Sequence, residues 1–587
     1  MSNLDKWNRK DASAENTISK IMNILDELNI PVEITESCNY KNLWYSNRME
    51  IVGLPSIGTN GKGISEQYAM ASCLGEFMER LQSSILLGYL FPQDSGDSLE
   101  VCRYDKKEFE KYFEHVCKYL TKDEQDELLL LKYKNILYHD IFTKKVIHMP
   151  ESLINILCGS NGLAAGNSFE EAYVQGISEI CERYVIQYIY TEKYDDMFST
   201  IRKSVLEKME SYNLIRAIEE KKFHVYIIDC TLKGILPVIG VLVFDPSYSK
   251  YFFKLGSDPD LDIALQRCIT EIFQGVSFDI NFRMHMNEYL TCERDDEGFW
   301  FSESRLINHT KAEVDGTGNI PRAFFKCLIK EVDEINGFSK EKLTNVTAAK
   351  FMTGKIKKIG KNIAIKNYTQ AGFPCVRILV SDMCQSFYYQ GANLLNVVKA
   401  IQKIKKLFRS NDFNYEEVLE CMYTILEYPA YVYDFNMAKL LGVVITDWMA
   451  YPYLHDPYLF TAYLSLHLRK YDAAINYLEI SNKNSRKNTI LAKLDLIVIK
   501  AMKENVTKEE LLEYISEVDE NHAMNSEIDL LYKIREDGIF VPKCFECSSC
   551  LFKANCCYKL YEKINTSISF ADETLDEKFN KFIELIS

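Results

Sequence analysis

The chain has 587 residues, of which 47% are hydrophobic and 26% charged, and these fractions are those of an ordinary globular protein with more than one domain. Its formal net charge of -15 argues against a nucleic-acid-binding surface, because phosphate contacts need a basic footprint. The polar N-terminus is unlike a secretory signal, and no apolar run approaches the roughly 18 residues that span a bilayer. With its 18 cysteines interpreted as reduced thiols, the sequence predicts a cytoplasmic protein that contacts neither membrane nor nucleic acid directly.

In chain order, a helix over 17–28 and a strand over 30–35 come before two segments that share one pattern. Each has a predicted Asn-Gly turn, at 59–61 and 160–162, followed by a helix with glutamates on one face. A capping-box pair, Ser168 and Glu171, predicts where the second helix begins. The polar positions are Ser72, Glu76, Glu79 and Arg80 in the first helix and Gln175, Glu179, Glu182 and Arg183 in the second. Two such helices can point four glutamates at one space.

Further along, three runs rich in β-forming residues (223–229, 236–244 and 251–255) predict adjacent strands. The helix that follows Asp258-Pro259-Asp260 carries Arg267 and Glu271 on one face. Strands over 363–367 and 376–381 close this α/β part, and from Ala392 onward long amphipathic helices dominate, with a small-residue pattern over 458–480 that is typical of a tetratricopeptide hairpin. The predicted domains are 1–390, 391–540 and 541–587.

Glutamates three residues apart are common on solvated helix faces, so one pair alone indicates no site. Here the helices are otherwise apolar and the unit is repeated, and clustered carboxylates suit Mg²⁺, which keeps open positions for phosphate oxygens. Lys10, Arg80 and Arg267 can balance the charge of a triphosphate. The run Thr59-Asn60-Gly61-Lys62-Gly63 lacks the first glycine and the final Ser or Thr of a P-loop, so a P-loop is rejected.

In the order and spacing of these motifs, together with Lys10-Asp11 near the N-terminus, the first 390 residues or so resemble the YcaO superfamily. The length and the helical C-terminal part are most similar to its enterobacterial members of the ribosomal-protein methylthiotransferase accessory factor type. The resemblance implies an α/β (α+β) YcaO-type core with duplicated turn–acidic-helix units, followed by an all-α, tetratricopeptide-like domain. It also implies an ATP site that is built without a P-loop and holds several Mg²⁺ ions.

The resemblance also assigns roles to individual residues of this chain. The implied Mg²⁺ ligands are Glu76, Glu79, Glu179, Glu182 and Glu271. The implied nucleotide contacts are Lys10, Thr17, Ser72, Asn161, Gln175 and Arg267. One departure is Ala164, which stands where the family usually has a serine and removes one hydroxyl from the pocket.

The activity implied by the resemblance is ATP-dependent activation of a peptide-bond carbonyl by phosphorylation. Cyclodehydratases of the family end in a proline-rich tail and carry a precursor-binding domain, whereas this chain has no proline after Pro542 and starts almost directly at Lys10. We therefore expect an accessory factor in ribosomal-protein β-methylthiolation or a thioamidation-type enzyme. An azoline-forming cyclodehydratase and an ATP-binding scaffold without peptide chemistry are the alternatives. Expected partners are a peptide or ribosomal protein, a methylthiotransferase or sulfur-delivery protein, and a second copy of the chain in a homodimer.

A cysteine cluster lies close to the C-terminus. Its spacing suits tetrahedral Zn²⁺ or an iron–sulfur cluster, and thiols without a metal are the alternative. The four best ligands are Cys544, Cys547, Cys550 and Cys556. A structural role that holds the C-terminus in place is the expectation.

Overall fold

The structure is a computed structural model. It describes residues 9–40, 42–83, 86, 105–130, 135–191, 197–273, 286–288, 308–309, 311–312, 318–385, 392–409, 414–427, 437, 452–484, 490–516, 524–539 and 573–587. These residues form two compact units: unit 1 comprises 9–385 and 573–587, and unit 2 comprises 392–539. The predicted cysteine cluster lies outside the described residues. In the described part of the chain, no helix combines the length and the apolar character that crossing a membrane requires.

The described residues of unit 1 form three sheets, and each of their strand pairings is antiparallel except that of β12 with β7. The first sheet has the order β1 (Val32–Tyr40), β2 (Trp44–Ile51) and β3 (Leu54–Gly63). The second has the order β11 (Asn287–Glu288), β10 (Lys250–Ser257), β9 (Val238–Phe244), β8 (His224–Asp229), β7 (Ser199–Ile201) and β12 (Glu331–Val332). The third has the order β5 (Val146–Pro150), β4 (Asn135–Asp140), β13 (Ile363–Asn367), β14 (Cys375–Val380) and β6 (Leu163–Ala165).

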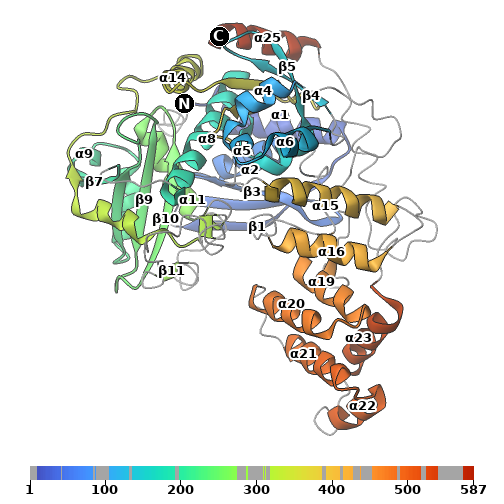
Figure 1. Cartoon of the computed structure of the whole chain (residues 1–587). Helices are drawn as coiled ribbons and strands as arrows, with labels where there is room; N and C mark the ends of the chain where they lie inside the picture. Colours follow the sequence, from blue (N-terminus) through green and yellow to red (C-terminus); the bar gives the residue numbers. More distant parts are fainter. Residues whose placement is uncertain are drawn as a thin grey trace. The chain divides into compact units, whose positions relative to one another are not determined.

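The helices of unit 1 cover these sheets (Figure 1). They are α1 (Ala14–Glu27), α2 (Glu66–Gln82), α4 (Lys106–Tyr112), α5 (Glu114–Lys118), α6 (Lys122–Leu130), α7 (Glu151–Cys158), α8 (Phe169–Thr191), α9 (Lys203–Leu206), α10 (Tyr212–Glu219), α11 (Leu261–Ile272), the 3₁₀ helix η3 (Arg322–Ile329), α14 (Asn345–Lys358) and α25 (Glu573–Ile586). Helix α8 is central, because it contacts β6 and β14 of the five-stranded sheet as well as β9 and β10 of the six-stranded sheet. Helix α2 packs on β2 and β3, and α11 packs on β9 and β10.

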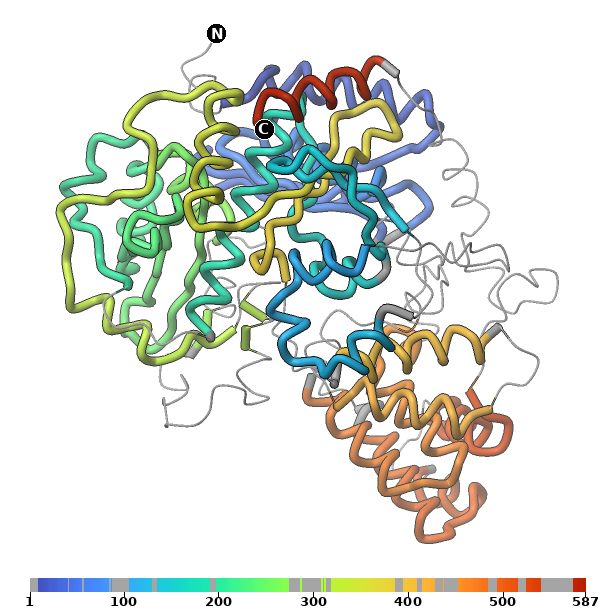
Figure 2. The backbone as a smooth tube through the Cα atoms, turned by 45° about the horizontal axis from the view of Figure 1, so that its top comes forward, coloured from blue at the N-terminus to red at the C-terminus, as the bar shows by residue number. Residues whose placement is uncertain are grey.

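The C-terminal helix α25, red in Figure 2, belongs to unit 1 although unit 2 precedes it in the chain. Its Phe579 ring lies 5.3 Å from that of Phe169, and its Phe582 ring lies 5.5 Å from that of Tyr173. Both partners belong to the first turns of α8. Helix α25 thus supports the start of the central helix.

Every element among the described residues of unit 2 is a helix, as the sequence predicts for this part of the chain. Its elements are α15 (Ala392–Arg409), α16 (Tyr415–Leu426), the 3₁₀ helix η4 (Pro452–Leu454), α19 (Pro457–His467), α20 (Tyr471–Asn484), α21 (Ile490–Lys503), α22 (Lys508–Ser516) and α23 (Asn525–Asp537). One continuous core of buried aliphatic and aromatic side chains runs through these helices. Neighbours in sequence pack as pairs, with α19 on α20 and α20 on α21.

Most predicted elements of unit 1 are confirmed, and one is wrong. Strands β8, β9 and β10 are adjacent as expected, and β13 and β14 pair with each other. The predicted turn at 59–61, however, lies within strand β3, which continues to Gly63. Gly61 serves a different purpose there: a Cβ at this position would lie 2.1 Å from the carbonyl oxygen of Ala69, so the glycine allows α2 to approach the strand closely. The second predicted turn, at 160–162, is confirmed, and Gly162 has a φ of +80°.

Candidate functional site

The first acidic helix, α2, has one apolar and one polar face. Ser65 caps it by accepting a hydrogen bond from the backbone N–H of Tyr68. Its buried residues include Cys73, Phe77 and Leu81, which pack toward the sheets. The opposite face presents Ser72, Glu76, Glu79 and Arg80, at helical spacing, to a cavity.

The second acidic helix, α8, begins where the sequence predicts. The Ser168 hydroxyl accepts a hydrogen bond from the backbone N–H of Glu171, and Ala172, Ile177 and Ile180 are fully buried. The Glu171 carboxylate accepts hydrogen bonds from the Lys10 ammonium, the backbone N–H of Asp11 and the side-chain amide of Asn167. The face toward the cavity presents Gln175, Glu179, Glu182 and Arg183.

A third wall comes from β3, β10 and α11. Asp260 caps α11, and Cys268 faces the sheet through its hydrogen bond to the carbonyl of Ile239. Arg267 and Glu271, on the other face, line the cavity. Strands β10 and β3 contribute Lys254 and Lys62, and Lys62 forms an ion pair with Glu271.

The N-terminal segment fixes a fourth wall by charge pairing. Arg9 binds the nearly buried Asp258 carboxylate through two guanidinium nitrogens, at 3.0 and 2.8 Å. Lys10 lies 3.1 Å from Glu171, whose second oxygen accepts the backbone N–H of Asp11 at 3.0 Å. These contacts span roughly 160 to 250 residues of sequence, so tertiary folding alone brings the segment to the site.

All four walls enclose one cavity of about 670 Å³. Ten of the eleven residues to which the resemblance gave nucleotide or Mg²⁺ roles line it: Lys10, Thr17, Ser72, Glu76, Glu79, Gln175, Glu179, Glu182, Arg267 and Glu271. Asn161 does not line the cavity. It is fully buried in the turn before β6, where its amide donates to the carbonyl of Cys384. Ala164 is likewise fully buried, beside the lining residue Ala165.

Sequence reasoning missed several charged residues at this cavity. Lys62 belongs to the rejected P-loop run, and it reaches the cavity from a strand. Arg9 and Asp258 carried no motif, and only the structure pairs them. Among the described lining residues, the basic side chains are Arg9, Lys10, Lys62, Arg80, Arg183, Lys254 and Arg267, and the acidic ones are Glu76, Glu79, Glu171, Glu179, Glu182, Asp258 and Glu271. Seven formal positive charges therefore meet seven negative ones.

Burial dominates the electrostatics of the glutamates. It raises the pKa of Glu76, Glu79 and Glu182, and the positive charges of Arg80 and Arg267 oppose the rise only in part. Burial also lowers the pKa of Lys62 to about 8, against the attraction of Glu182. The buried carboxylates therefore depend on nearby positive charge, and the arginine and lysine side chains of the cavity supply part of it.

The donor set fits Mg²⁺ together with a polyphosphate. Carboxylate oxygens are the hard ligands that Mg²⁺ prefers, and arginine and lysine bind phosphate oxygens. Among the residues that the structure describes, no three acidic, histidine or cysteine side chains converge closely enough to hold a metal ion as they stand. The glutamates are instead engaged by neighbouring basic groups.

Comparison with known proteins agrees with this site. Residues 60–384, more than half of the chain, match the family model described as YcaO cyclodehydratase, ATP- and Mg²⁺-binding. The chain belongs to the YcaO family. The matched range includes α2, α8 and α11 and therefore every predicted glutamate of the site, and the resemblance inferred from the sequence is confirmed.

The chain is similar to two curated relatives. It is 27% identical over 410 residues to the ribosomal protein S12 methylthiotransferase accessory factor YcaO of Escherichia coli (strain K12), covering 64% of this chain and 65% of that protein. An uncharacterized protein of Haemophilus influenzae is 31% identical over 294 residues, or 46% of this chain and 49% of the relative. The chain thus spans about half to two thirds of the length of these relatives.

The solved structures overlap the chain more loosely. YcaO from Methanopyrus kandleri bound with AMPPCP and Mg²⁺ has a TM-score of 0.41 and 15% identity, covering 64% of this chain and 92% of that one. A heterocyclase in complex with substrate and cofactor has a TM-score of 0.44 and 16% identity, covering 65% and 54%.

Proposed function

We propose that this chain is an ATP- and Mg²⁺-dependent enzyme that activates a peptide-bond carbonyl by phosphorylation. The observation that carries the proposal is the convergence of two acidic helices, a third helix and the N-terminal segment on one cavity that combines oxygen ligands with basic groups. Its volume falls within the range of about 300–1,000 Å³ that is typical of small-molecule sites.

In this proposal the five glutamates named above hold Mg²⁺, while Lys10, Gln175 and Arg267 contact the nucleotide. Bound Mg²⁺ supplies positive charge against the phosphate oxygens. A nucleophile adds to the amide carbon, and the resulting oxyanion bonds to the γ-phosphorus as the bond to ADP breaks. The carbon–oxygen bond then breaks and phosphate leaves with the former carbonyl oxygen. The basic walls fix the triphosphate in place, and such positioning contributes most of the catalysis in phosphoryl transfer.

We infer that the reaction serves ribosomal-protein β-methylthiolation as an accessory step, or a thioamidation-type modification. The E. coli relative, named for the first of these, supports that choice. The second candidate, an azoline-forming cyclodehydratase, is favoured by the description of the matched family. The substrate is a peptide or a ribosomal protein in either case, and the sulfur-delivery partner and homodimer expected from the resemblance stay predictions.

In our proposal residues 1–390 form the ATP-binding domain, and the helical unit, over 391–540, is a partner-binding domain with tetratricopeptide-like pairing. The packing of α19 on α20 and of α20 on α21 supports this role, because stacked helical pairs present extended binding surfaces. In a variant of the proposal, the protein is a scaffold without peptide chemistry: it binds the nucleotide in unit 1 and recruits partners through the helical unit.

Titration calorimetry with ATP, with and without Mg²⁺, tests the proposal, together with phosphate release in the presence of candidate peptides. We expect binding that depends on Mg²⁺ and slow hydrolysis that a correct peptide accelerates. Mass spectrometry of the peptide separates the pathways, since an azoline loses one water whereas a thioamide exchanges oxygen for sulfur. Absence of nucleotide binding with Mg²⁺ would contradict the proposal, and binding without any phosphate release would favour the scaffold variant.

A further inference from the structure

Each acidic helix carries an arginine directly after its second glutamate, and both arginines fold back onto their own helix. Arg80 places Nη2 3.4 Å from Glu76 Oε1 and Nε 3.2 Å from Glu79 Oε1. Arg183 places Nη2 2.9 Å from Glu179 Oε1. Each copy of the duplicated unit therefore consists of two glutamates and an arginine that forms an ion pair with at least one of them.

The remaining two glutamates of the site have basic neighbours from other elements. Lys62, on β3, forms an ion pair with Glu271 of α11. The carboxylate of Glu182 interacts chiefly with Arg267 and then with Lys62. Every one of the five glutamates thus has a positive group beside it in the protein alone.

This pairing has a consequence for metal binding. A carboxylate oxygen that accepts a guanidinium hydrogen bond must give up or share that bond to coordinate Mg²⁺, and the arginine and the metal repel each other at such short range. Glu76 and Glu179 retain 34% and 26% of their side-chain surface and Arg80 and Arg183 retain 30% and 24%, so screening by water at this site is incomplete. Metal alone therefore meets a site whose negative charge is already neutralised.

We infer that Arg80, Arg183 and Lys62 are counter-ions that make Mg²⁺ binding at this site depend on the nucleotide. The triphosphate brings negative charge and oxygen acceptors into the cavity. The three basic side chains then exchange glutamate for phosphate, where arginine binds bidentately, and the released carboxylates coordinate the metal. This inference rests on the proposed function, because it concerns the same cavity, and it adds an order of assembly and three phosphate-positioning residues.

The test uses Mn²⁺ as a probe of the full-length protein, with affinity measured by calorimetry and by the electron paramagnetic resonance signal of free Mn²⁺. In the unaltered protein, we expect a nonhydrolysable ATP analogue to increase Mn²⁺ affinity at least about tenfold. Arg183→Gln removes one counter-ion, so Mn²⁺ alone should bind about tenfold more tightly and the enhancement by the analogue should shrink, as expected for a charge within a few Å. Arg183→Lys keeps the charge and should behave like the unaltered protein in Mn²⁺ binding without nucleotide.

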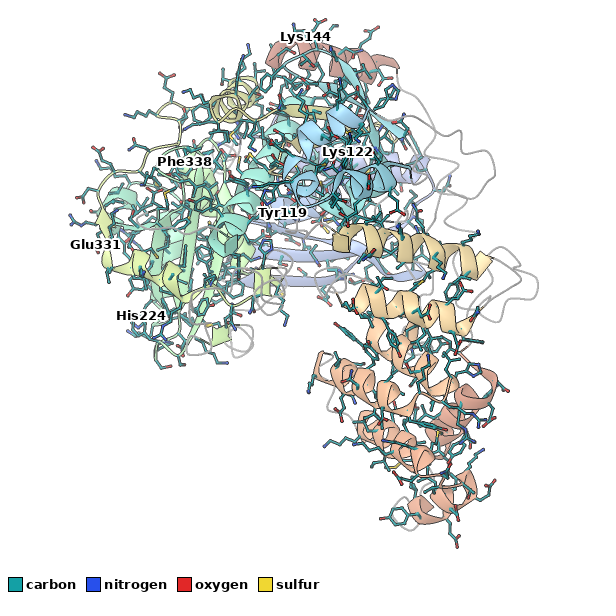
Figure 3. The ribbon with its side chains drawn as sticks, in the orientation of Figure 1. Tyr119, Lys122, Lys144, His224, Glu331 and Phe338 are labelled. Carbon is teal, nitrogen blue, oxygen red and sulfur yellow. The ribbon has the colours of Figure 1, made fainter. Side chains whose placement is uncertain are left out.

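A matched control is Arg202→Gln. Arg202 forms ion pairs with Glu331 and Asp333, both at 2.9 Å, beside the edge strand β12, where Figure 3 labels Glu331 at the periphery of unit 1. This variant also loses a paired arginine of unit 1 but should leave both Mn²⁺ affinities unchanged. Arg80→Gln repeats the experiment on α2 if the α8 variant does not fold.

Unchanged or weaker Mn²⁺ binding by a folded Arg183→Gln or Arg80→Gln variant, without nucleotide, would overturn the inference. Equal Mn²⁺ affinity of the unaltered protein with and without the analogue would overturn it as well. A failure of the proposed function looks different, because the analogue would then not bind the unaltered protein at all.

Discussion

The two units bury acidic side chains in opposite ways. At the cavity of unit 1, each of the five glutamates lies beside an arginine or lysine. In the core of unit 2, Asp495 of α21 lies instead beside another acid, Glu527 of α23, and the buried Tyr463 of α19. Burial first, and then the charge of Glu527 and a hydrogen bond with it, raise the pKa of Asp495 to about 8.

The two arrangements suit different purposes. The glutamates of unit 1 are available to bind a ligand, whereas protonation neutralises Asp495 in unit 2. A basic partner opposes the rise in pKa that burial causes, so it favours the ionised carboxylate, which can exchange that partner for a metal. A carboxyl whose neighbour is an acid becomes neutral instead, because two buried negative charges repel. The cavity of unit 1 is therefore suited to ion binding, and the acidic pair of unit 2 couples stability to pH.

The largest expected effect comes from removing one glutamate of the cavity. Glu179→Gln keeps the shape of the side chain but replaces a charged metal ligand by a neutral amide, and it leaves Arg183 without its carboxylate. We expect Mg²⁺-dependent ATP affinity to fall about 100-fold or more, since even the loss of a group behind a ligand costs 10- to 100-fold. Titration calorimetry measures this, and circular dichroism checks that the fold is intact.

Glu331→Gln provides the control for that variant. Glu331 pairs with Arg202 outside the cavity and is half exposed, so ATP affinity should stay within about twofold. Unchanged affinity in a folded Glu179→Gln protein would remove this residue from the site and weaken the assignment of α8 as a metal-binding helix.

The second prediction concerns the acidic pair of unit 2. The pKa of Asp495 is raised in the folded protein, so the native state holds a proton that the unfolded chain releases near its ordinary pKa of about 4. Stability should then decrease as pH rises from about 4 to about 8, because the native state binds more protons over that range. Asp495→Asn removes this dependence and should make unit 2 more stable than the parent by roughly 2–4 kcal/mol at pH 9.

Thermal unfolding of the parent and the variant between pH 5 and pH 9 measures the effect. The two proteins should be close in stability at pH 5, where Asp495 is protonated, and should diverge as pH rises. A constant difference across this range would mean that the native state binds no extra proton at Asp495, and hence that folding does not raise its pKa. ATP binding to unit 1 serves as an internal control and should not change.

The features of the fold and of the site that the sequence predicts are those that depend on contacts between residues close together in the chain. The acidic helices follow from local patterns: Ser65 and Ser168 cap them, and the glutamates recur at helical spacing opposite buried residues such as Cys73 and Ile177. The helices of the C-terminal part likewise follow from their amphipathic pattern, and strands β8, β9 and β10 follow from runs of β-forming residues. The ten cavity residues could be assigned to one site only because their motifs resemble a family. Spacing within each helix does not predict that α2, α8 and α11 come together.

What escaped prediction is set by contacts distant in sequence. Asn60-Gly61 has the composition of a turn, yet it extends a strand, because a glycine is what lets Ala69 pack against it. Arg9 and Asp258 are separated by 249 positions, and no local pattern predicts that they pair. The segment with Lys62 was considered only as a P-loop and rejected as one, and only the tertiary structure places Lys62 beside Glu271. In each case the residue that determines the local structure or the charge pairing lies outside the stretch of sequence from which the prediction was made.

The smallest expected effect lies at the rim of the cavity, where one charge is buried and its partner is not. Glu171 is 5% exposed whereas Lys10 is 41% exposed. Burial alone would raise the pKa of Glu171, but Lys10 and the backbone N–H of Asp11 more than offset it and the pKa is lowered. Glu171 thus adds stability above its ordinary pKa that is lost as pH falls through the lowered value.

Lys10→Met removes the opposing charge, so it should reduce ATP affinity by about tenfold, the value of one charge-assisted hydrogen bond, and cost less than about 1 kcal/mol of stability because the lysine is solvated. Glu171→Gln is its counterpart: it keeps Lys10 and releases it from its carboxylate, so ATP affinity should be equal or higher. Calorimetry on both variants distinguishes two roles for Lys10. If both lose affinity equally, the lysine acts only by holding α8 in place. If only Lys10→Met loses affinity, Lys10 contacts the nucleotide itself. Lys10 would then exchange Glu171 for the nucleotide, just as the five glutamates are proposed to exchange their basic partners for the metal.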